Sequence, residues 1–176
     1  EKTEKAFVDV HRSYCQRKIN KNDAEMVGQH VLDQNLAMRL PKRGCSGADA
    51  GRLAMLIAIL EKKLGLMLAV QDVYLNLAGG IRVVEPAADL AIALAVFSSF
   101  RNSVVDPGMV VFGEVGLTGE VRGVSNPEAR VKEAAKLGFR TCLIPRANVP
   151  RVAGMGQDIT ICGVSTLAEA IDQMIL

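Results

Sequence analysis

An almost uninterrupted apolar segment constrains the fold of this chain more than any other feature of its sequence. Pro86 stands where a first helical turn can begin, and nearly every residue from there to Phe97 is apolar. A helix that is apolar on every face has no side to turn to water, so it must lie in the middle of a domain. The segment is also well short of the roughly 18 to 20 residues that a membrane span needs. The sequence therefore predicts a central core helix.

Amphipathic helices and short strands alternate on either side of this segment. Asp49 can cap a helix that ends at Gly65, and its apolar residues recur at the spacing of one helical face: Leu53, Leu56, Ile57, Leu60 and Leu64. Apolar Val73, Leu75 and Leu77 alternate with Tyr74 and Asn76, which predicts a half-buried strand. We further expect strands at 109–112, 141–144 and 159–164, a hairpin at 113–121, and helices at 127–137 and 166–174, the last capped by Ser165. Strands alternating with helices predict a single α/β domain.

The N-terminal segment, residues 1–40, is polar and weakly patterned, with a short candidate strand at Phe7–Val10. Both histidines, His11 and His30, lie in it, and we do not expect them to share a metal ion. The four cysteines are far apart and form no C-x-x-C pair, which fits neither a zinc site nor a small disulfide framework. We expect no metal centre and reduced thiols.

Composition excludes several classes of function. The formal net charge is only +2, so any DNA contact must come from a local patch rather than from an overall basic balance. Aromatic residues make up 4% of the chain, which argues against an aromatic stacking platform for single-stranded nucleic acid. The N-terminus has no apolar signal-peptide core. These features predict a cytoplasmic protein that does not contact membranes.

Common catalytic motifs are missing. The chain has no G-x-x-x-x-G-K-[ST], and the glycine cluster of Gly44, Gly47 and Gly51 lacks the lysine and serine that a P-loop requires. It also has no G-x-S-x-G, no H-E-x-x-H and no serine, histidine and acid set in its patterned region. We therefore expect no bound nucleotide and no ordinary hydrolase site.

Two long motifs carry a family resemblance. Ala78–Ala91 reads AGGIRVVEPAADLA and Gly113–Arg122 reads GEVGLTGEVR, and Lys132–Phe139 and Gly163–Ala170 follow in order. Over residues 41–176 the chain resembles the C-terminal domain of the RadA (Sms) DNA repair family, which is itself similar to the proteolytic domain of Lon. The resemblance implies a Lon proteolytic-domain-like fold of the ribosomal protein S5 domain 2-like class, a mixed sheet with packed helices. Residues 1–40 match the family poorly.

Lon-type proteases use a Ser-Lys dyad, in which a lysine of lowered pKa takes the proton of the serine hydroxyl. The family pattern places the serine directly after a proline at the start of the buried helix, where this chain has Ala87. The lysine position, nine residues after Gly119, is occupied by Glu128, and the nearby Arg130 keeps its proton and cannot act as a base. The resemblance therefore implies a protease frame without its dyad.

Other nucleophiles do not replace the dyad. Ser98 and Ser99 lie at the far end of the same helix, and Ser125 precedes Glu128; each is interpreted as a cap or a surface residue. Cys142 lies in an apolar strand and is expected to be inert.

Charged residues supply candidate contact sites. For a contact between neighbouring subunits, against the alternative of a plain solvated face, the candidates are Glu114, Glu120, Arg122, Glu128 and Arg130. For sequence-independent contact with DNA phosphates, against the alternative of ordinary solubilising charges, the candidates are Arg39, Lys42, Arg43, Arg122, Arg130 and Lys132.

The resemblance implies a non-proteolytic scaffold and DNA-binding domain of an ATP-dependent repair and branch-migration protein acting in homologous recombination. Its implied partners are DNA, a RecA-type recombinase and copies of itself, in a hexameric ring. ATP and Mg²⁺ are expected in an upstream ATPase domain, and none of these cofactors in this one, so the domain itself is not expected to be an enzyme. Two alternatives stay open: an active Lon-like Ser-Lys peptidase, and a protein-interaction module without a DNA role.

Overall fold

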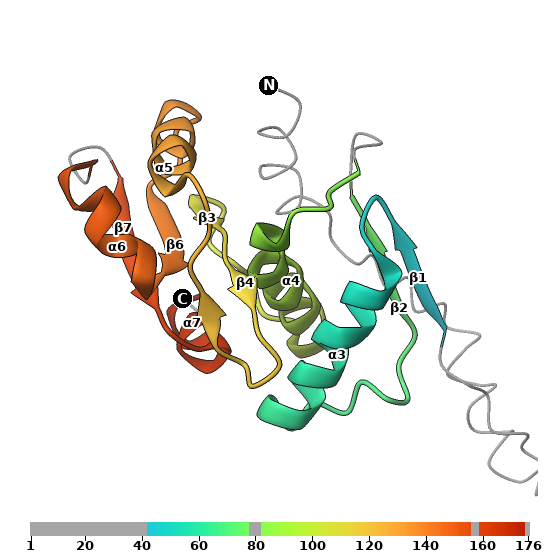
Figure 1. Cartoon of the computed structure of the whole chain (residues 1–176). Helices are drawn as coiled ribbons and strands as arrows, with labels where there is room; N and C mark the ends of the chain where they lie inside the picture. Colours follow the sequence, from blue (N-terminus) through green and yellow to red (C-terminus); the bar gives the residue numbers. More distant parts are fainter. Residues whose placement is uncertain (1–41, 78–81, 156–158, 175–176) are drawn as a thin grey trace, which may run out of the picture.

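The computed structural model of the chain describes residues 42–77, 82–155 and 159–174 (Figure 1). The candidate strand Phe7–Val10, both histidines and Arg39 lie outside these described residues. The helices are α3 Ala50–Leu64, α4 Asp89–Arg101, α5 Pro127–Lys136, α6 Val149–Val152 and α7 Leu167–Met174. The strands are β1 Arg43–Ser46, β2 Val73–Asn76, β3 Met109–Val111, β4 Glu114–Val115, β5 Val121–Arg122, β6 Thr141–Pro145 and β7 Thr160–Val164.

Helix α3 forms as its sequence predicts. The Asp49 side chain accepts a hydrogen bond from the Arg52 N–H at 2.8 Å, which satisfies one of the free donors of the first turn. At the other end Gly65 adopts a left-handed conformation with φ of 64°, and its N–H bonds to the Glu61 carbonyl. The predicted apolar face is buried, apart from a half-buried Leu64.

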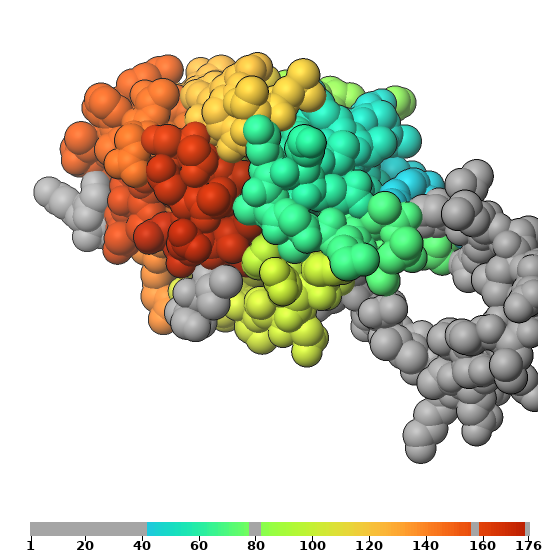
Figure 2. All heavy atoms as spheres, turned by 90° about the horizontal axis from the view of Figure 1, so that it is seen from below, coloured from blue at the N-terminus to red at the C-terminus, as the bar shows by residue number. Residues whose placement is uncertain are grey.

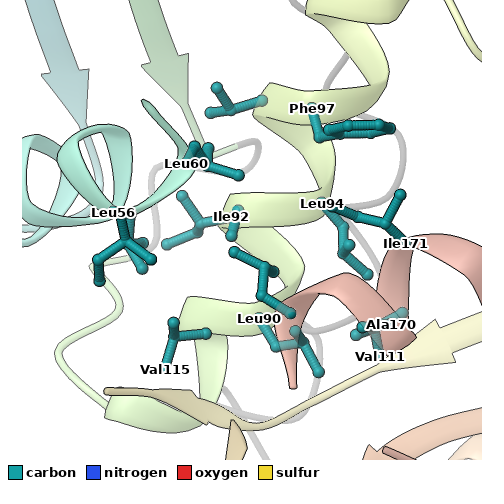
Figure 3. Close-up of a cluster of buried hydrophobic side chains, with 14 of the residues drawn as sticks. Leu56, Leu60, Leu90, Ile92, Leu94, Phe97, Val111, Val115, Ala170 and Ile171 are labelled. Carbon is teal, nitrogen blue, oxygen red and sulfur yellow. The ribbon is translucent and has the colours of Figure 1, made fainter. Parts of the chain in front are cut away.

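Helix α4 is the predicted central helix. A short 3-10 turn at Pro86–Ala88 leads into it, and it continues to Arg101, four residues beyond the predicted end at Phe97. It lies between α3 and the β3-β6-β7 sheet (Figure 1). Its buried side chains meet those of α3, α7 and the strands in one core (Figure 3). The absence of a polar face is thus explained by neighbours on several sides.

The strands form three small sheets within the described residues, rather than the single mixed sheet implied by the resemblance. β1 and β2 pair in parallel through α3, and β3, β6 and β7 form a parallel sheet in that order. β4 and β5 form the predicted antiparallel hairpin. Parallel neighbours need long crossovers and a hairpin needs only a short turn, which matches the lengths of the connecting segments.

Both faces of the β3-β6-β7 sheet are covered. Met109 and Val111 point into the core with α4 and α7, whereas Val110 and Phe112 point into a second cluster with α5 and α6. Strands buried on both faces read as continuous apolar runs, as β3 and β6 do here.

Two details differ from the sequence predictions. Thr166, not Ser165, caps α7: its hydroxyl accepts the Glu169 N–H at 3.2 Å, while the Ser165 hydroxyl accepts a hydrogen bond from Arg146. The reason is spacing, since an N-cap oxygen reaches the N–H three residues later. No sequence pattern predicts the 3-10 turn at Arg146–Asn148 or α6, because both are too short to show a helical period.

No helix in the described part of the chain has the length and apolarity to cross a membrane.

Candidate nucleic-acid interface and the expected dyad positions

Ala87, at the position where the resemblance to Lon-type proteases places the serine, is buried among backbone hydrogen bonds. It is 1% exposed, and its carbonyl accepts the Gly113 N–H at 2.8 Å, while the Gly113 carbonyl accepts the Leu90 N–H at 3.0 Å. Gly113, which lies between β3 and β4, is therefore hydrogen-bonded both to the 3-10 turn before α4 and to the first turn of α4. A methyl group in this setting offers no atom that can attack a carbonyl.

A buried carboxylate two residues later was missed by the sequence reasoning. Asp89 is 1% exposed and accepts hydrogen bonds from Nε and Nη2 of Arg52 and from the Val115 N–H at 3.2 Å. It joins α3, α4 and β4 at one point. The hydrogen bond to Asp89 is the main reason why the pKa of the Arg52 guanidinium is raised. A signal existed, because a charged residue in an otherwise apolar buried helix must find a partner.

An ion pair lies beside both dyad positions. Arg130, two residues after Glu128, donates to the carboxylate of Glu85, which is two residues before Ala87. The Arg130 guanidinium also sits 5.7 Å from the centre of the Phe112 ring and donates to the Ser125 carbonyl at 3.0 Å. Arg130 therefore ties α5 to the start of α4 as a fixed positive charge.

Glu128 itself faces another helix. Its two carboxylate oxygens accept hydrogen bonds from Nε and Nη2 of Arg151 in α6, at 2.8 and 3.0 Å. Its pKa lies below the ordinary value, first because of a hydrogen bond from its own backbone N–H and then because of Arg151. A carboxylate held in its charged form by an arginine is a poor base for a serine hydroxyl.

The remaining interface candidates form one cluster on the hairpin. Arg122 pairs with Glu120 and, at 3.6 Å, with Glu114. Several hydrogen bonds lower the pKa of Glu120 to about 2, and the one from the Thr118 hydroxyl contributes most. The hairpin is held against the body, since the Gly119 carbonyl accepts the Leu167 N–H, and a Cβ added at Gly119 would lie 3.3 Å from the Lys63 side chain. Figure 2 shows this region beside α3 and α7.

The alternative nucleophiles are occupied or shielded. The Ser98 hydroxyl bonds to the Ser103 carbonyl, and burial raises the pKa of the Cys142 thiol to about 12. Across residues 42–77, 82–155 and 159–174, no serine hydroxyl is hydrogen-bonded to a lysine amine. Nor does this part of the chain contain a group of three or more histidine, cysteine or acidic side chains suited to a metal ion.

The DNA candidates do not form one patch. Lys42 and Arg43 lie at the start of β1, at the far side of the domain from Lys132 on α5 (Figure 1). Arg122 and Arg130 are engaged in the ion pairs described above, whereas Lys132 forms no ion pair with any described residue. The described DNA candidates thus lie on three separate elements, namely β1, the hairpin and α5.

Comparisons with known proteins agree with the resemblance carried by the two long sequence motifs. Residues 53–148 match the family model described as subunit ChlI of Mg-chelatase. The chain is 48% identical over 132 residues to DNA repair protein RadA of Halalkalibacterium halodurans, covering 75% of this chain and 29% of the relative. It is 50% identical over 131 residues to RadA of Bacillus subtilis, and 45% identical over 143 residues to RadA of Escherichia coli.

The matched part of the chain spans 74%, 75% and 81% of its length in these three comparisons, but only 28%, 29% and 30% of the RadA relatives. The family model covers more than half of the chain, including most of α3 and all of α4, the hairpin and α5. The chain therefore belongs to the family of the ChlI model and corresponds to the C-terminal region of DNA repair protein RadA.

Proposed function

We propose that the chain is a non-proteolytic, Lon-like scaffold and DNA-binding domain of a RadA-type repair protein. One observation carries the non-proteolytic part: a buried methyl at Ala87 and an arginine-bound carboxylate at Glu128 stand where a hydroxyl and an amine are needed. The identity with RadA relatives supports the DNA repair role.

ATP hydrolysis and branch migration in homologous recombination are assigned to a protein of which this chain is one domain. The relatives are more than three times as long as the matched region. ATP and Mg²⁺ would be bound by parts outside that region, and a RecA-type recombinase would act with the whole protein. We also assign the protein to the cytoplasm, because its relatives are bacterial DNA repair proteins.

The scaffold role rests on a ring of copies. Surface ion pairs inside one chain can exchange partners with a neighbouring copy at little cost, because exposed pairs contribute only about 0–1 kcal/mol. The hairpin cluster and the pair of Glu128 with Arg151 present both charge signs for such contacts. A mass in solution of several copies supports the ring, and a strict monomer of the full-length protein contradicts it.

DNA binding would be electrostatic and independent of sequence. Contacts from lysine and arginine to phosphates release counterions, so the affinity should fall steeply as salt rises. The test is binding of labelled duplex DNA at two salt concentrations. Binding at low salt that weakens at high salt supports the proposal; no binding at low salt favours the alternative, an interaction module without a DNA role.

A further inference from the structure

The hairpin tip, residues 116–119 between β4 and β5, is a fully hydrogen-bonded turn that presents one exposed leucine. The Gly116 N–H bonds to the Glu120 carbonyl at 2.9 Å, and Gly119 takes the left-handed conformation that such hairpin loops need, with φ of 85°. The Glu120 carboxylate lies over Gly116, where a side chain would overlap it, and accepts the Thr118 N–H at 3.0 Å. Leu117 lies at this tip and is 72% exposed.

A leucine on an ordered turn is suited to binding another surface. Single exposed apolar side chains are common, so exposure alone is weak evidence. Leu117 differs because the hydrogen bonds of the turn already fix the backbone on both sides of it, and less conformational entropy is then lost on binding. Turns favour glycine, proline, asparagine and aspartate, and leucine has none of the properties that favour those residues. The hairpin tip therefore has the features of an anchor.

Positive charge lies beside the hairpin tip. A Cβ added at Gly119 would lie 3.3 Å from the Lys63 side chain, so the last turn of α3 runs alongside the tip. Lys62 and Lys63 are both exposed in that turn. Neither lysine forms an ion pair within residues 42–77, 82–155 and 159–174. A surface that binds the tip should therefore combine an apolar hollow with acidic groups.

The chain itself carries a hollow of this kind, here called the α7 cavity. It measures about 260 Å³, lies between β7 and α7, and is lined by Cys162–Val164, Glu169, Asp172, Gln173 and Arg146. It is smaller than the roughly 300–1,000 Å³ of typical small-molecule sites. A cavity of roughly 150 Å³ can already hold a benzene molecule, so the α7 cavity has room for one leucine side chain.

The α7 cavity has an acidic rim and is not filled by its own chain's hairpin. Arg146 and Glu169 form an ion pair at 3.3 Å and offset each other's charge. Asp172 is exposed and forms no ion pair with any described residue, which leaves one negative charge at the rim. No hairpin residue lines the cavity, and the bond from the Leu167 N–H to the Gly119 carbonyl holds the tip in place. Tip and cavity can therefore meet between two copies.

We propose that Leu117 of one copy inserts into the α7 cavity of a second copy, with Lys63 facing Asp172. The inference rests on the ring of copies proposed above and names one of its contacts. Because tip and cavity are different parts of the surface, the contact is head-to-tail, and a pair of copies still has one free tip and one free cavity. Further copies add in the same way until the ring closes.

The first experiment uses the native thiol that lines the α7 cavity. In the full-length protein, Leu117→Cys should form a disulfide with Cys162 of a neighbouring copy on mild oxidation, seen as linked chains on a non-reducing gel. Adding Cys162→Ala should abolish this link. Leu137→Cys is the matched control, because Leu137 is 52% exposed at the end of α5 and is no part of the contact.

The second experiment measures association of the full-length protein by sedimentation velocity. Leu117→Ala should weaken association by about 10- to 100-fold, the loss expected when a buried leucine side chain leaves a contact, and Leu137→Ala should not weaken it. Lys63→Glu and Asp172→Lys should each weaken association at low salt. The double variant should recover it, since opposite charges again face each other.

The outcomes separate the contact from the ring. A protein that assembles, forms no link through Cys162 and associates equally well as Leu117→Ala overturns the contact but leaves the ring of copies in place. A full-length protein that stays monomeric at every concentration overturns both.

Discussion

Replacing Arg52 with alanine is expected to destabilise the fold by about 3 kcal/mol, at the lower end of the roughly 3–5 kcal/mol typical for breaking a buried ion pair. The substitution leaves the Asp89 carboxylate, which is 1% exposed, with a single hydrogen bond from Val115 at 3.2 Å. The lower end applies because the Arg52 side chain is 32% exposed, so water already screens part of the interaction.

The assay is urea unfolding followed by far-ultraviolet circular dichroism. Arg122→Ala is the control, because that arginine is 55% exposed and its removal should cost far less than that of Arg52. In the double variant Arg52→Ala with Asp89→Asn, much of the loss should be recovered, since no buried charge then lacks a partner. A cost for Arg52→Ala no greater than that for Arg122→Ala would show that the pair of Arg52 and Asp89 does not stabilise the fold.

Three further outcomes are expected. The Cys142 thiol, whose pKa burial raises to about 12, should react with a disulfide reagent at pH 8 far more slowly than the half-buried Cys45, as measured by absorbance before and after unfolding. The pKa of Glu120 is lowered from 4.5 to about 2, so its hydrogen bonds should stabilise the hairpin fully above pH 4.5 and be lost as the pH falls through 2; a carboxyl titration by NMR with a midpoint near 4.5 would contradict this. Gly113→Ala should cost about 1–3 kcal/mol in thermal unfolding, because the new Cβ would lie 3.0 to 3.3 Å from three buried side chains, whereas an unchanged melting temperature would show that this junction yields easily.

Most elements could be predicted because their local patterns were strong. The apolar face and both caps of α3 come from residues close together in the sequence. Helix α4 could be predicted because its sequence has no polar face. The segment between β6 and β7 could not be predicted, since Pro150 and two short 3-10 turns interrupt any helical period.

The charged residues show where sequence reasoning ends. Glu85 and Arg130 are 45 positions apart, and Glu128 and Arg151 are 23 apart, so only the folded chain reveals that these residues are paired. The same holds for Tyr74, whose alternation predicted exposure, but whose support by Gly44 depends on the register of two strands. Asp89 was readable, because its position inside an apolar helix required a partner.

Incubation of the chain with unfolded casein, followed by mass spectrometry of the products, tests whether the domain lacks proteolytic activity. Ala87 and Glu128 leave no hydroxyl and no amine at the dyad positions, so casein should remain intact. Peptide products that appear with the purified chain, and persist when contaminating proteases are inhibited, would contradict the claim and restore an active peptidase as the function.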